Sequence, residues 1–286
     1  MSSKLIIILG IFLAVAEARY APESSKPYLG YSNTKFDITK IVGGSEAVKN
    51  NYPHQVSLQW GTPPLTQVSH FCGGSIISER WILTAGHCVL AVPDYGSFIV
   101  KAGKHVLNEQ ENEEQSIEVE ASFIHESYSG GVAPYDVAIL KLKVSLVINQ
   151  WVSPIKLPKQ GILHNGDAVL TGWGSIVPSG TTLPSNLQTA VFPIIDLDTC
   201  RSSLEQIVGP SPLHETNICT GPLTGGYSAC SGDSGGPLIS RQPQQDDEVI
   251  GIVSWGIIPC GTLGAPSVFT RVSAFVEWIE IKIASN

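Results

Sequence analysis

The feature that most restricts the fold of this chain is a series of short apolar runs, each closed by Gly, Pro or Asn. Between residues 41 and 286 these runs cover residues 55–60, 74–78, 98–103, 116–124, 137–142, 168–171, 190–195, 249–255 and 268–272. Val, Ile and Thr are frequent in them. Short β-branched runs bounded by turn residues are typical of strands, so this region is predicted to be all-β.

The C-terminal residues follow a different period. Apolar residues spaced as on one face of a helix are Val272, Phe275, Val276, Ile279 and Ile283. An amphipathic helix is therefore predicted over residues 273–284. Its aromatic side chains are expected to pack on the β core, with a partner-binding helix as the alternative.

Composition narrows the classes of function. Hydrophobic residues make up 43% of the 286 residues and charged residues 15%, which argues against a disordered chain. The net charge of −8 disfavours nucleic acid and anionic membranes as partners. Many of the acidic residues form one cluster: Glu109, Glu111, Glu113, Glu114, Glu118 and Glu120. We interpret this cluster as a solvated loop and strand face, with a calcium site as the alternative.

The first 18 residues have the form of a secretory signal peptide. Lys4 precedes an apolar run at residues 5–14, and Ala16-Glu17-Ala18 has the small-x-small pattern of a signal-peptidase site. The run is too short to cross a bilayer. We therefore expect residues 1–18 to be removed and the protein to be secreted to the extracellular space. There its six Cys can form disulfides.

Residues 19–40 form a separate region that is polar and has neither strand nor helix periodicity. It ends at Lys40, directly before Ile41-Val42-Gly43-Gly44. A basic residue at the edge of an irregular stretch is an accessible site for proteolysis. We interpret residues 19–40 as an activation pro-segment and residues 41–286 as the mature domain.

Three local sequences carry the chemically reactive residues. In chain order they are Leu83-Thr84-Ala85-Gly86-His87-Cys88, Asp136-Val137-Ala138-Ile139-Leu140 and Gly232-Asp233-Ser234-Gly235-Gly236-Pro237. Each alone has a structural explanation: a core His, a turn Asp and a tight glycine turn. A Ser hydroxyl is a weak nucleophile at neutral pH and needs a base, for which the ordinary pKa of His is suitable. Together, in a six-Cys chain with a secretion signal, they indicate nucleophilic catalysis.

With these motifs, and with Cys72-Gly73-Gly74-Ser75 and Trp278-Ile279, residues 41–286 resemble a trypsin/chymotrypsin-type serine endopeptidase. The chain order His, Asp, Ser also matches that family. The resemblance implies an all-β fold of two six-stranded antiparallel β-barrels packed together, with a C-terminal α-helix. It implies hydrolysis of protein and peptide substrates through an acyl-enzyme, by an enzyme made as a zymogen. A digestive role is favoured, with venom activity and a limited proteolytic cascade as the alternatives.

The resemblance also gives the reactive residues their roles. Ser234 is expected to attack the scissile carbonyl, with His87 as general base and Asp136 holding the required His87 tautomer. The backbone N–H groups of Gly232 and Ser234 are expected to form the oxyanion hole. One departure is Gly86, which stands where the family usually has a second Ala but removes no catalytic atom.

The same resemblance implies how the precursor is activated and how the cysteines pair in disulfides. Cleavage after Lys40 by a separate trypsin-like protease is expected to free the Ile41 amine, which then pairs with Asp233. His70 stands where family precursors use a His to hold that carboxylate. The six Cys allow many pairings, and sequence alone does not choose among them. The pairs that the resemblance implies are Cys72–Cys88, Cys200–Cys219 and Cys230–Cys260.

The substrate pocket is expected to have Ser228 at its floor and Gly256 and Ser267 in its walls. Trypsin-like members carry an Asp at the floor, whereas Ser228 brings no charge to pair with a buried Lys or Arg. Gly256 leaves the entrance open to large side chains, and Ser267 narrows the deep end. We therefore expect chymotrypsin-like cleavage after Phe, Leu, Tyr or Met. The alternatives are elastase-like specificity, trypsin-like specificity and a catalytically inactive binding homologue.

The remaining sequence signals point to no cofactor. No Cys/His spacing resembles a zinc site, and no Gly-rich loop precedes a helix as a phosphate site requires, so no metal is expected. The His residues outside the motifs are interpreted as structural or surface groups. A monomer is expected, with proteinaceous inhibitors as further partners.

Overall fold

The structure is a computed structural model that describes residues 40–241 and 246–286. The signal peptide predicted at residues 1–18, and the pro-segment up to residue 39, lie outside the described residues. The chain divides into two units, Met1–Asp37 and Ile38–Asn286, and everything below concerns the second. In the part of the chain that the structure describes, no helix is both long and apolar enough to cross a membrane.

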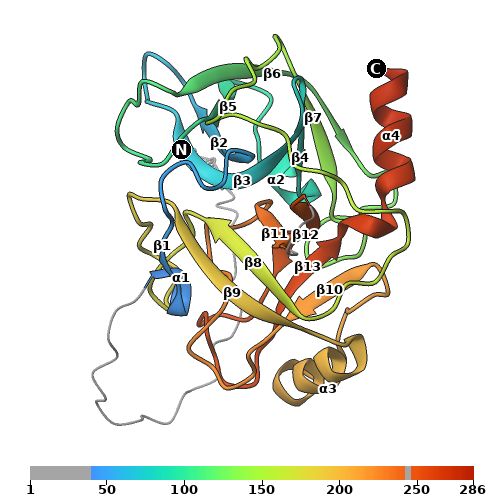
Figure 1. The fold of residues 1–286 in the computed structure, drawn as a ribbon. Helices are drawn as coiled ribbons and strands as arrows, with labels where there is room; N and C mark the ends of the chain where they lie inside the picture. The colour runs from blue at the N-terminus through green and yellow to red at the C-terminus, as the bar shows by residue number, and fades with distance from the viewer. Residues whose placement is uncertain (1–39, 242–245) are drawn as a thin grey trace, which may run out of the picture. The chain divides into compact units, whose positions relative to one another are not determined.

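Six antiparallel strands close the first barrel (Figure 1). They are β2 (Gln55–Gly61), β3 (Ser69–Ser78), β4 (Trp81–Thr84), β5 (Ser97–Ala102), β6 (Gln115–Ile124) and β7 (Ala138–Leu142). Their order is β2-β3-β4-β7-β6-β5, and β5 pairs with β2 to close the ring. Val56, Leu58, Ile82 and Leu140 are fully buried in the core. Apolar residues of these strands therefore supply the core of this barrel.

The second barrel has the same construction. Its strands are β8 (Asp167–Gly172), β9 (Gln188–Ile195), β10 (Asn217–Thr220), β11 (Pro237–Ser240), β12 (Glu248–Trp255) and β13 (Ser267–Arg271). The order is β9-β10-β13-β12-β11-β8, and β8 pairs with β9 to close the ring. A short strand, β1 (Ser45–Glu46), pairs with β9 from outside. The all-β fold of two six-stranded barrels is thus confirmed.

Every apolar run named above overlaps one of these strands. The strands that the runs do not predict are β1, β4, β10 and β11, each of four residues or fewer. Such short segments carry too few residues to show a period. Their positions are set by pairing: Leu83 of β4, for example, lies between Ser75 of β3 and Ile139 of β7.

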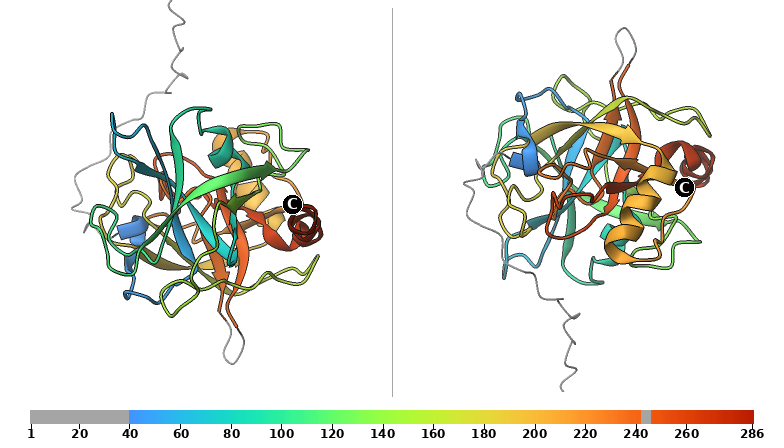
Figure 2. Two further views of the ribbon diagram at one scale, coloured as in Figure 1. Left: turned by 90° about the horizontal axis from the view of Figure 1, so that it is seen from above. Right: turned by 90° about the horizontal axis from the view of Figure 1, so that it is seen from below.

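The helices lie at the surface, outside both barrels (Figure 2). They are α1 (Lys40–Gly43), α2 (Gly86–Leu90), α3 (Leu197–Val208) and α4 (Val276–Ser285), with a 3₁₀ turn, η1, at Val272–Ala274. The predicted C-terminal helix is confirmed, except that Phe275 separates η1 from α4. Helix α3 was not predicted; the Asp196 carboxylate caps it by accepting the Thr199 N–H at 2.8 Å.

Hydrogen bonds join the two barrels where their strands approach each other. Thr171 Oγ1 on β8 donates to Gln55 Oε1 on β2 at 2.6 Å, and both side chains are buried. The indole of Trp173 donates to the His105 carbonyl at 3.0 Å. Buried hydrogen bonds of this kind fix relative position, because breaking one leaves a desolvated polar group unpaired. The reactive residues come from both sides of this junction.

Candidate active site

The fold places His87 in the short helix α2, which begins directly after β4. A disulfide between Cys72 on β3 and Cys88 on α2 ties this helix to the first barrel. The other two disulfides are Cys200–Cys219 and Cys230–Cys260. These are the three pairs that the family resemblance implies, and the first of them braces the residue next to His87.

His87 and Asp136 form the most sharply defined pair in the site. The Asp136 Oδ2 atom lies 2.7 Å from His87 Nδ1, and Oδ1 accepts the His87 backbone N–H at 2.8 Å. The Asp136 side chain is 2% exposed, whereas that of His87 is 27% exposed. Because the carboxylate holds the proton on Nδ1, the Nε2 atom is left as an acceptor that can serve as a base.

Two residues of the second barrel hold Asp136, and sequence reasoning missed both roles. Ser254 Oγ on β12 donates to Asp136 Oδ2 at 2.6 Å, and Thr270 Oγ1 on β13 donates to the Asp136 backbone carbonyl at 2.7 Å. Neither residue lies near Asp136 in sequence, so no local pattern could pair them. The carboxylate therefore accepts three hydrogen bonds in total and is well oriented toward His87.

The structure gives a physical reason for Gly86. A Cβ on Gly86 would lie 2.8 Å from Cδ1 of Tyr128 and 3.2 Å from Cγ2 of Ile124, so a methyl group does not fit without a shift. Burial and the nearby Asp136 charge raise the pKa of Tyr128, which keeps its phenol neutral. Gly86 thus allows a neutral aromatic ring to pack directly beneath the His87 helix.

Ser234 lies in the loop between β10 and β11. Its backbone carbonyl accepts the Gly73 N–H at 2.7 Å, and the N–H of Gly235 donates to the Val253 carbonyl at 2.9 Å. These contacts attach the loop to both barrels. Among the residues described, no hydrogen bond joins Ser234 Oγ to the His87 ring. Catalytic hydrogen bonds are often long in the absence of substrate.

Gly232, expected to contribute to an oxyanion hole, has a backbone conformation that favours glycine. Its φ is 99°, and a Cβ would lie 2.9 Å from Leu183 Cδ2 and 3.1 Å from Gly174 Cα. Only glycine fits here without strain. Within the described ranges, the N–H groups of Gly232 and Ser234 donate to no other group. Both are available to an oxygen that becomes negatively charged.

Asp233 is fully buried, and no hydrogen bond within the described residues joins its carboxylate to His70, the residue expected to hold it. Asp233 Oδ1 accepts the Gly174 N–H at 2.8 Å, and Oδ2 accepts the Cys230 N–H at 3.0 Å. Burial raises the pKa of Asp233 to about 6. His70 instead lies 3.0 Å from the Gly232 carbonyl through Nε2 and 2.9 Å from Ser57 Oγ through Nδ1. In this structure His70 therefore orients the Gly232 peptide.

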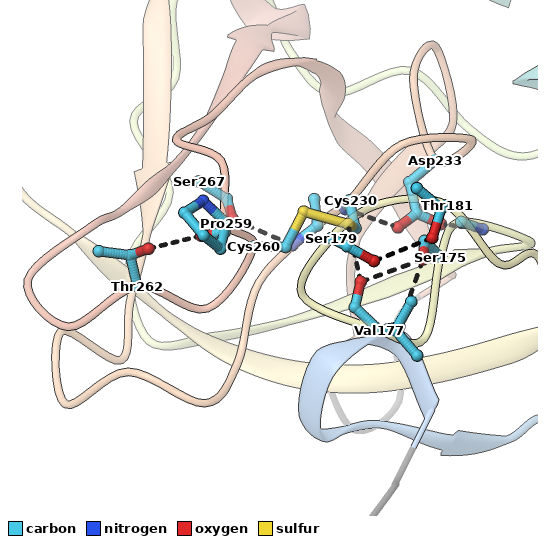
Figure 3. Close-up of a disulfide and its surroundings, with 12 residues drawn as sticks. Ser175, Val177, Ser179, Thr181, Cys230, Asp233, Pro259, Cys260, Thr262 and Ser267 are labelled. Atoms are coloured by element: carbon cyan, nitrogen blue, oxygen red, sulfur yellow. Dashed lines mark hydrogen bonds between the residues drawn. A yellow bond between two sulfur atoms is a disulfide. The ribbon is translucent and has the colours of Figure 1, made fainter. Parts of the chain in front are cut away.

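The segment that follows the expected cleavage site lies against the same loop. The Val42 carbonyl accepts the Ser228 N–H at 3.2 Å, and Val42 packs with the Cys230–Cys260 disulfide. Cys230 in turn donates its N–H to Asp233. Figure 3 shows this disulfide with Asp233 on one side and Ser267 on the other. Residues next to the cleavage site thus contact the groups that position Ser234.

A cavity of about 140 Å³ opens beside Ser234. Its lining consists of Ala229, Cys230, Ser231, Ser234, Val253, Ser254, Trp255, Gly256, Ile257, Ile258 and Cys260, with no carboxylate among them. Of the predicted pocket residues, Gly256 lines it, whereas Ser228 and Ser267 are buried outside the lining. Ser267 Oγ accepts the N–H of Ala229 at 3.1 Å. Ser267 therefore influences the shape of the cavity indirectly, because it holds Ala229, which lines the cavity.

Lysine side chains form ion pairs with members of the acidic cluster. The side chain of Lys104 is 0% exposed, and its ammonium donates to Glu114 Oε2 and to the Glu109 carbonyl, each at 2.6 Å. Lys101 binds the other Glu114 oxygen at 2.7 Å. The pKa of Glu114 is lowered to about 2 by these lysines, against an opposing effect of burial. Both carboxylate oxygens of Glu114 and the Glu109 carbonyl oxygen, which calcium could otherwise use, are therefore already occupied by lysine ammonium groups.

We expect the stability of the protein to be independent of calcium and to depend on Lys104. Addition of calcium or of a chelator should leave the melting temperature unchanged. Lys104→Met should reduce the free energy of unfolding by about 3–5 kcal/mol, because it removes one partner of a buried ion pair. Lys143→Met, at an exposed pair with Glu118, is the matched control and should leave stability nearly unchanged, because solvent screens the pair. A rise in melting temperature with calcium would contradict this account.

In the described part of the chain, one group has ligand atoms close enough together for a metal: Cys72, His87 and Cys88. Both cysteines are in a disulfide and cannot supply thiolates. This group is therefore not a metal site; it consists of the candidate base, His87, and the disulfide that holds its helix in place.

Comparison with known proteins gives one consistent family. A family model described as Trypsin matches residues 41–279. Trypsin Tyr p 3.0101 of Tyrophagus putrescentiae is 37% identical over 288 residues, covering 99% of this chain and 92% of the relative. Trypsin of Sus scrofa is 36% identical over 251 residues, covering 87% of this chain and 98% of the relative. Anionic trypsin of Canis lupus familiaris is 37% identical over 251 residues, with 87% and 92% covered.

Proposed function

Because the chain belongs to the trypsin family of serine endopeptidases, we propose that it is a secreted protease that cleaves after large apolar or aromatic residues. It is made as a precursor with a signal peptide at residues 1–18 and a pro-segment at residues 19–40, and the protease domain spans residues 41–286. It acts as a monomer on protein and peptide substrates and is subject to proteinaceous inhibitors. The observation that carries the specificity is the cavity beside Ser234, whose lining has no carboxylate.

The reaction uses the contacts described above. Ser234 Oγ attacks the scissile carbonyl carbon while its proton passes to His87 Nε2, and the Asp136 carboxylate stabilises the resulting imidazolium. The carbonyl oxygen becomes an oxyanion, which the N–H groups of Gly232 and Ser234 bind. His87 then protonates the leaving amine as the carbon–nitrogen bond breaks. Water repeats the sequence on the acyl-enzyme and frees Ser234.

The electrostatics of the pocket support an apolar preference. A Lys or Arg side chain in the cavity would need an anion, and neither the lining nor Ser228, which lies outside that lining, supplies one. The Ser228 hydroxyl is buried and has no hydrogen-bond partner within the described residues. The nearest acid in sequence, Asp233, accepts the N–H groups of Gly174 and Cys230. The names of the relatives favour the trypsin-like alternative, whereas the absence of a carboxylate from the cavity lining supports the apolar preference.

Specificity is tested with peptides that vary only in the residue before the scissile bond. We expect kcat/KM to be highest for Phe, Tyr, Leu and Met, with Lys and Arg lower. Ser267→Gly should raise kcat/KM for Trp by about 10-fold, because a smaller side chain at that point lets Ala229 move outward. Ser267→Ala keeps the Cβ and is the matched control, which should gain less. Arg or Lys as the best residue would establish the trypsin-like alternative, and Ala above Leu and Phe the elastase-like one.

A further inference from the structure

Another cavity, of about 310 Å³, lies in the second barrel and shares no lining residue with the cavity beside Ser234. Its walls come from the end of β9, the start of α3, the start of β10 and the end of β13. The segment between β7 and β8 supplies one further side. Figure 1 shows α3 beside β10 and the end of β9. We call this space the α3 cavity; its volume lies at the lower end of the range of small-molecule sites in proteins.

Most side chains that line the α3 cavity are aliphatic or neutral. The aliphatic ones are Leu163, Ile194, Ile195, Leu197 and Ile218. Leu163 is exposed to solvent, whereas Ile218 is buried, so the apolar lining runs from the surface into the barrel. Such a lining favours an alkyl chain, because each methylene that it removes from water contributes to binding.

Arg271 supplies the positive charge of the α3 cavity. Its guanidinium donates to Ser273 Oγ at 2.8 Å and to the Glu215 carbonyl at 3.0 Å, and both of these acceptors are neutral. Among the described residues, the buried Nε atom of Arg271 has no hydrogen-bond partner, and no salt bridge includes this side chain. Burial lowers the pKa of Arg271, against an opposing effect of Glu215. A carboxylate in the cavity would therefore give this desolvated cation the partner that it lacks.

The other two titratable groups of the lining are His164 and Asp196. The His164 side chain is 6% exposed, its Nε2 lies 3.4 Å from Glu248 Oε2, and its Nδ1 has no partner within the described residues. The Asp196 carboxylate accepts the N–H and the hydroxyl of Thr199, at 2.8 and 2.7 Å. Asp196 is therefore engaged at the start of α3, whereas Arg271 and His164 each keep a nitrogen that can donate to a ligand oxygen.

We propose that the α3 cavity binds a small aliphatic monocarboxylate. The carboxylate pairs with Arg271 and lies near His164, and the alkyl tail lies against Leu197 and Ile218. Free fatty acids of medium length share this chemistry with the C-terminal end of a peptide whose last residue is aliphatic. The site uses no member of the catalytic group, so the proposal stands independently of the protease activity.

The first test measures binding of carboxylates of increasing length to the full chain by titration calorimetry. From butanoate to hexanoate, and again to octanoate, we expect the Kd to fall by about 10-fold, because each buried methylene strengthens binding by up to about fourfold. Acetate should show no saturable binding. Octanamide keeps the tail but not the charge, and its Kd should be at least about 10-fold higher than that of octanoate.

The second test places octanoate in the α3 cavity by substitution. Leu197→Trp, which fills the cavity, and Arg271→Met, which removes its cation, should each raise the octanoate Kd by at least about 10-fold. Val208→Trp, at the other end of α3, is the matched control for size. Arg201→Met is the matched control for charge, because Arg201 also donates to a backbone carbonyl but lies outside the lining. Both controls should keep the parent Kd, and the melting temperature of each variant reports whether it is folded.

A peptide that ends in Leu with a free carboxylate separates the two sources of the ligand. Tighter binding than octanoate, lost in Leu197→Trp and Arg271→Met, would identify a peptide C-terminus; weaker binding would identify a free fatty acid. Octanoate binding that survives in both of these variants would place the ligand elsewhere, in the cavity beside Ser234 for example, and would overturn the proposal. Equal affinity for octanamide, or no saturable binding of octanoate, would also overturn it.

Discussion

Asp136→Asn is expected to lower kcat by about 10⁴-fold without unfolding the protein. The carboxylate accepts three hydrogen bonds, from the His87 backbone N–H, from His87 Nδ1 and from Ser254 Oγ. An amide has a single oxygen, so its NH₂ group must face one or more of these donors. If it faces Nδ1, the His87 proton moves to Nε2, and the ring can no longer accept the Ser234 proton.

The measurement is kcat on a Phe peptide together with the melting temperature. Asp198→Asn, on the exposed surface of α3, removes one negative charge far from the site and should leave kcat unchanged. Loss of activity with a nearly constant melting temperature supports the assigned role. A variant that retains kcat within about tenfold of the parent would show that Asp136 does not set the His87 tautomer.

Cleavage after Lys40 is expected to raise kcat/KM by about 10²- to 10³-fold. Asp233 is buried with two backbone N–H donors, and its pKa is raised to about 6, so its charged form lacks a cation. Val42 already contacts Ser228 and the Cys230–Cys260 disulfide, so a free Ile41 amine would be delivered next to them. Removing one partner of a buried ion pair typically costs about 3–5 kcal/mol, which sets the expected range.

Two variants separate the steps of this activation. Lys40→Gln should resist trypsin at that bond and remain inactive. Asp233→Asn should be cleaved normally but gain little activity. Pairing lowers the pKa of Asp233 and raises that of the amine, so activity should decline in alkali as the amine loses its proton. A processed Asp233→Asn enzyme with full activity would rule out the ion pair. Efficient self-activation of the precursor would contradict the uncharged pocket, because cleavage after Lys requires an acid there.

Local pattern was sufficient to predict the strands of five or more residues and the C-terminal helix, and to single out the motifs that carry the reactive residues. The runs at residues 55–60 and 249–255 became β2 and β12 because alternation within a strand depends only on neighbours. His87 and Asp136 could be named from their motifs, although the 2.7 Å contact between them depends on the register of β4 with β7. The double barrel was predicted from the family resemblance, because the periodicity within a strand does not specify how the strands pair to close a barrel.

The features that sequence did not predict depend on contacts between distant residues. Ser254 and Thr270 reach Asp136 from more than 100 positions away. Lys104 could be counted as a basic residue in an acidic segment, but its complete burial against Glu114 depends on the folded loop. His70 was expected to hold the Asp233 carboxylate and instead contacts the Gly232 carbonyl, while the N–H groups of Gly174 and Cys230 bind that carboxylate.

The central claim, that Ser234 is the nucleophile of an endopeptidase, is tested most directly by covalent labelling. The full chain is activated by trypsin, the trypsin is removed, and the product is treated with a fluorophosphonate and digested for mass spectrometry. The account predicts one equivalent of label on the peptide that contains Ser234, with loss of peptidase activity in proportion. The label should be absent from Ser234→Ala and strongly reduced in the uncleaved Lys40→Gln precursor. Active enzyme that takes up no label, or takes it up at another residue, would contradict the account.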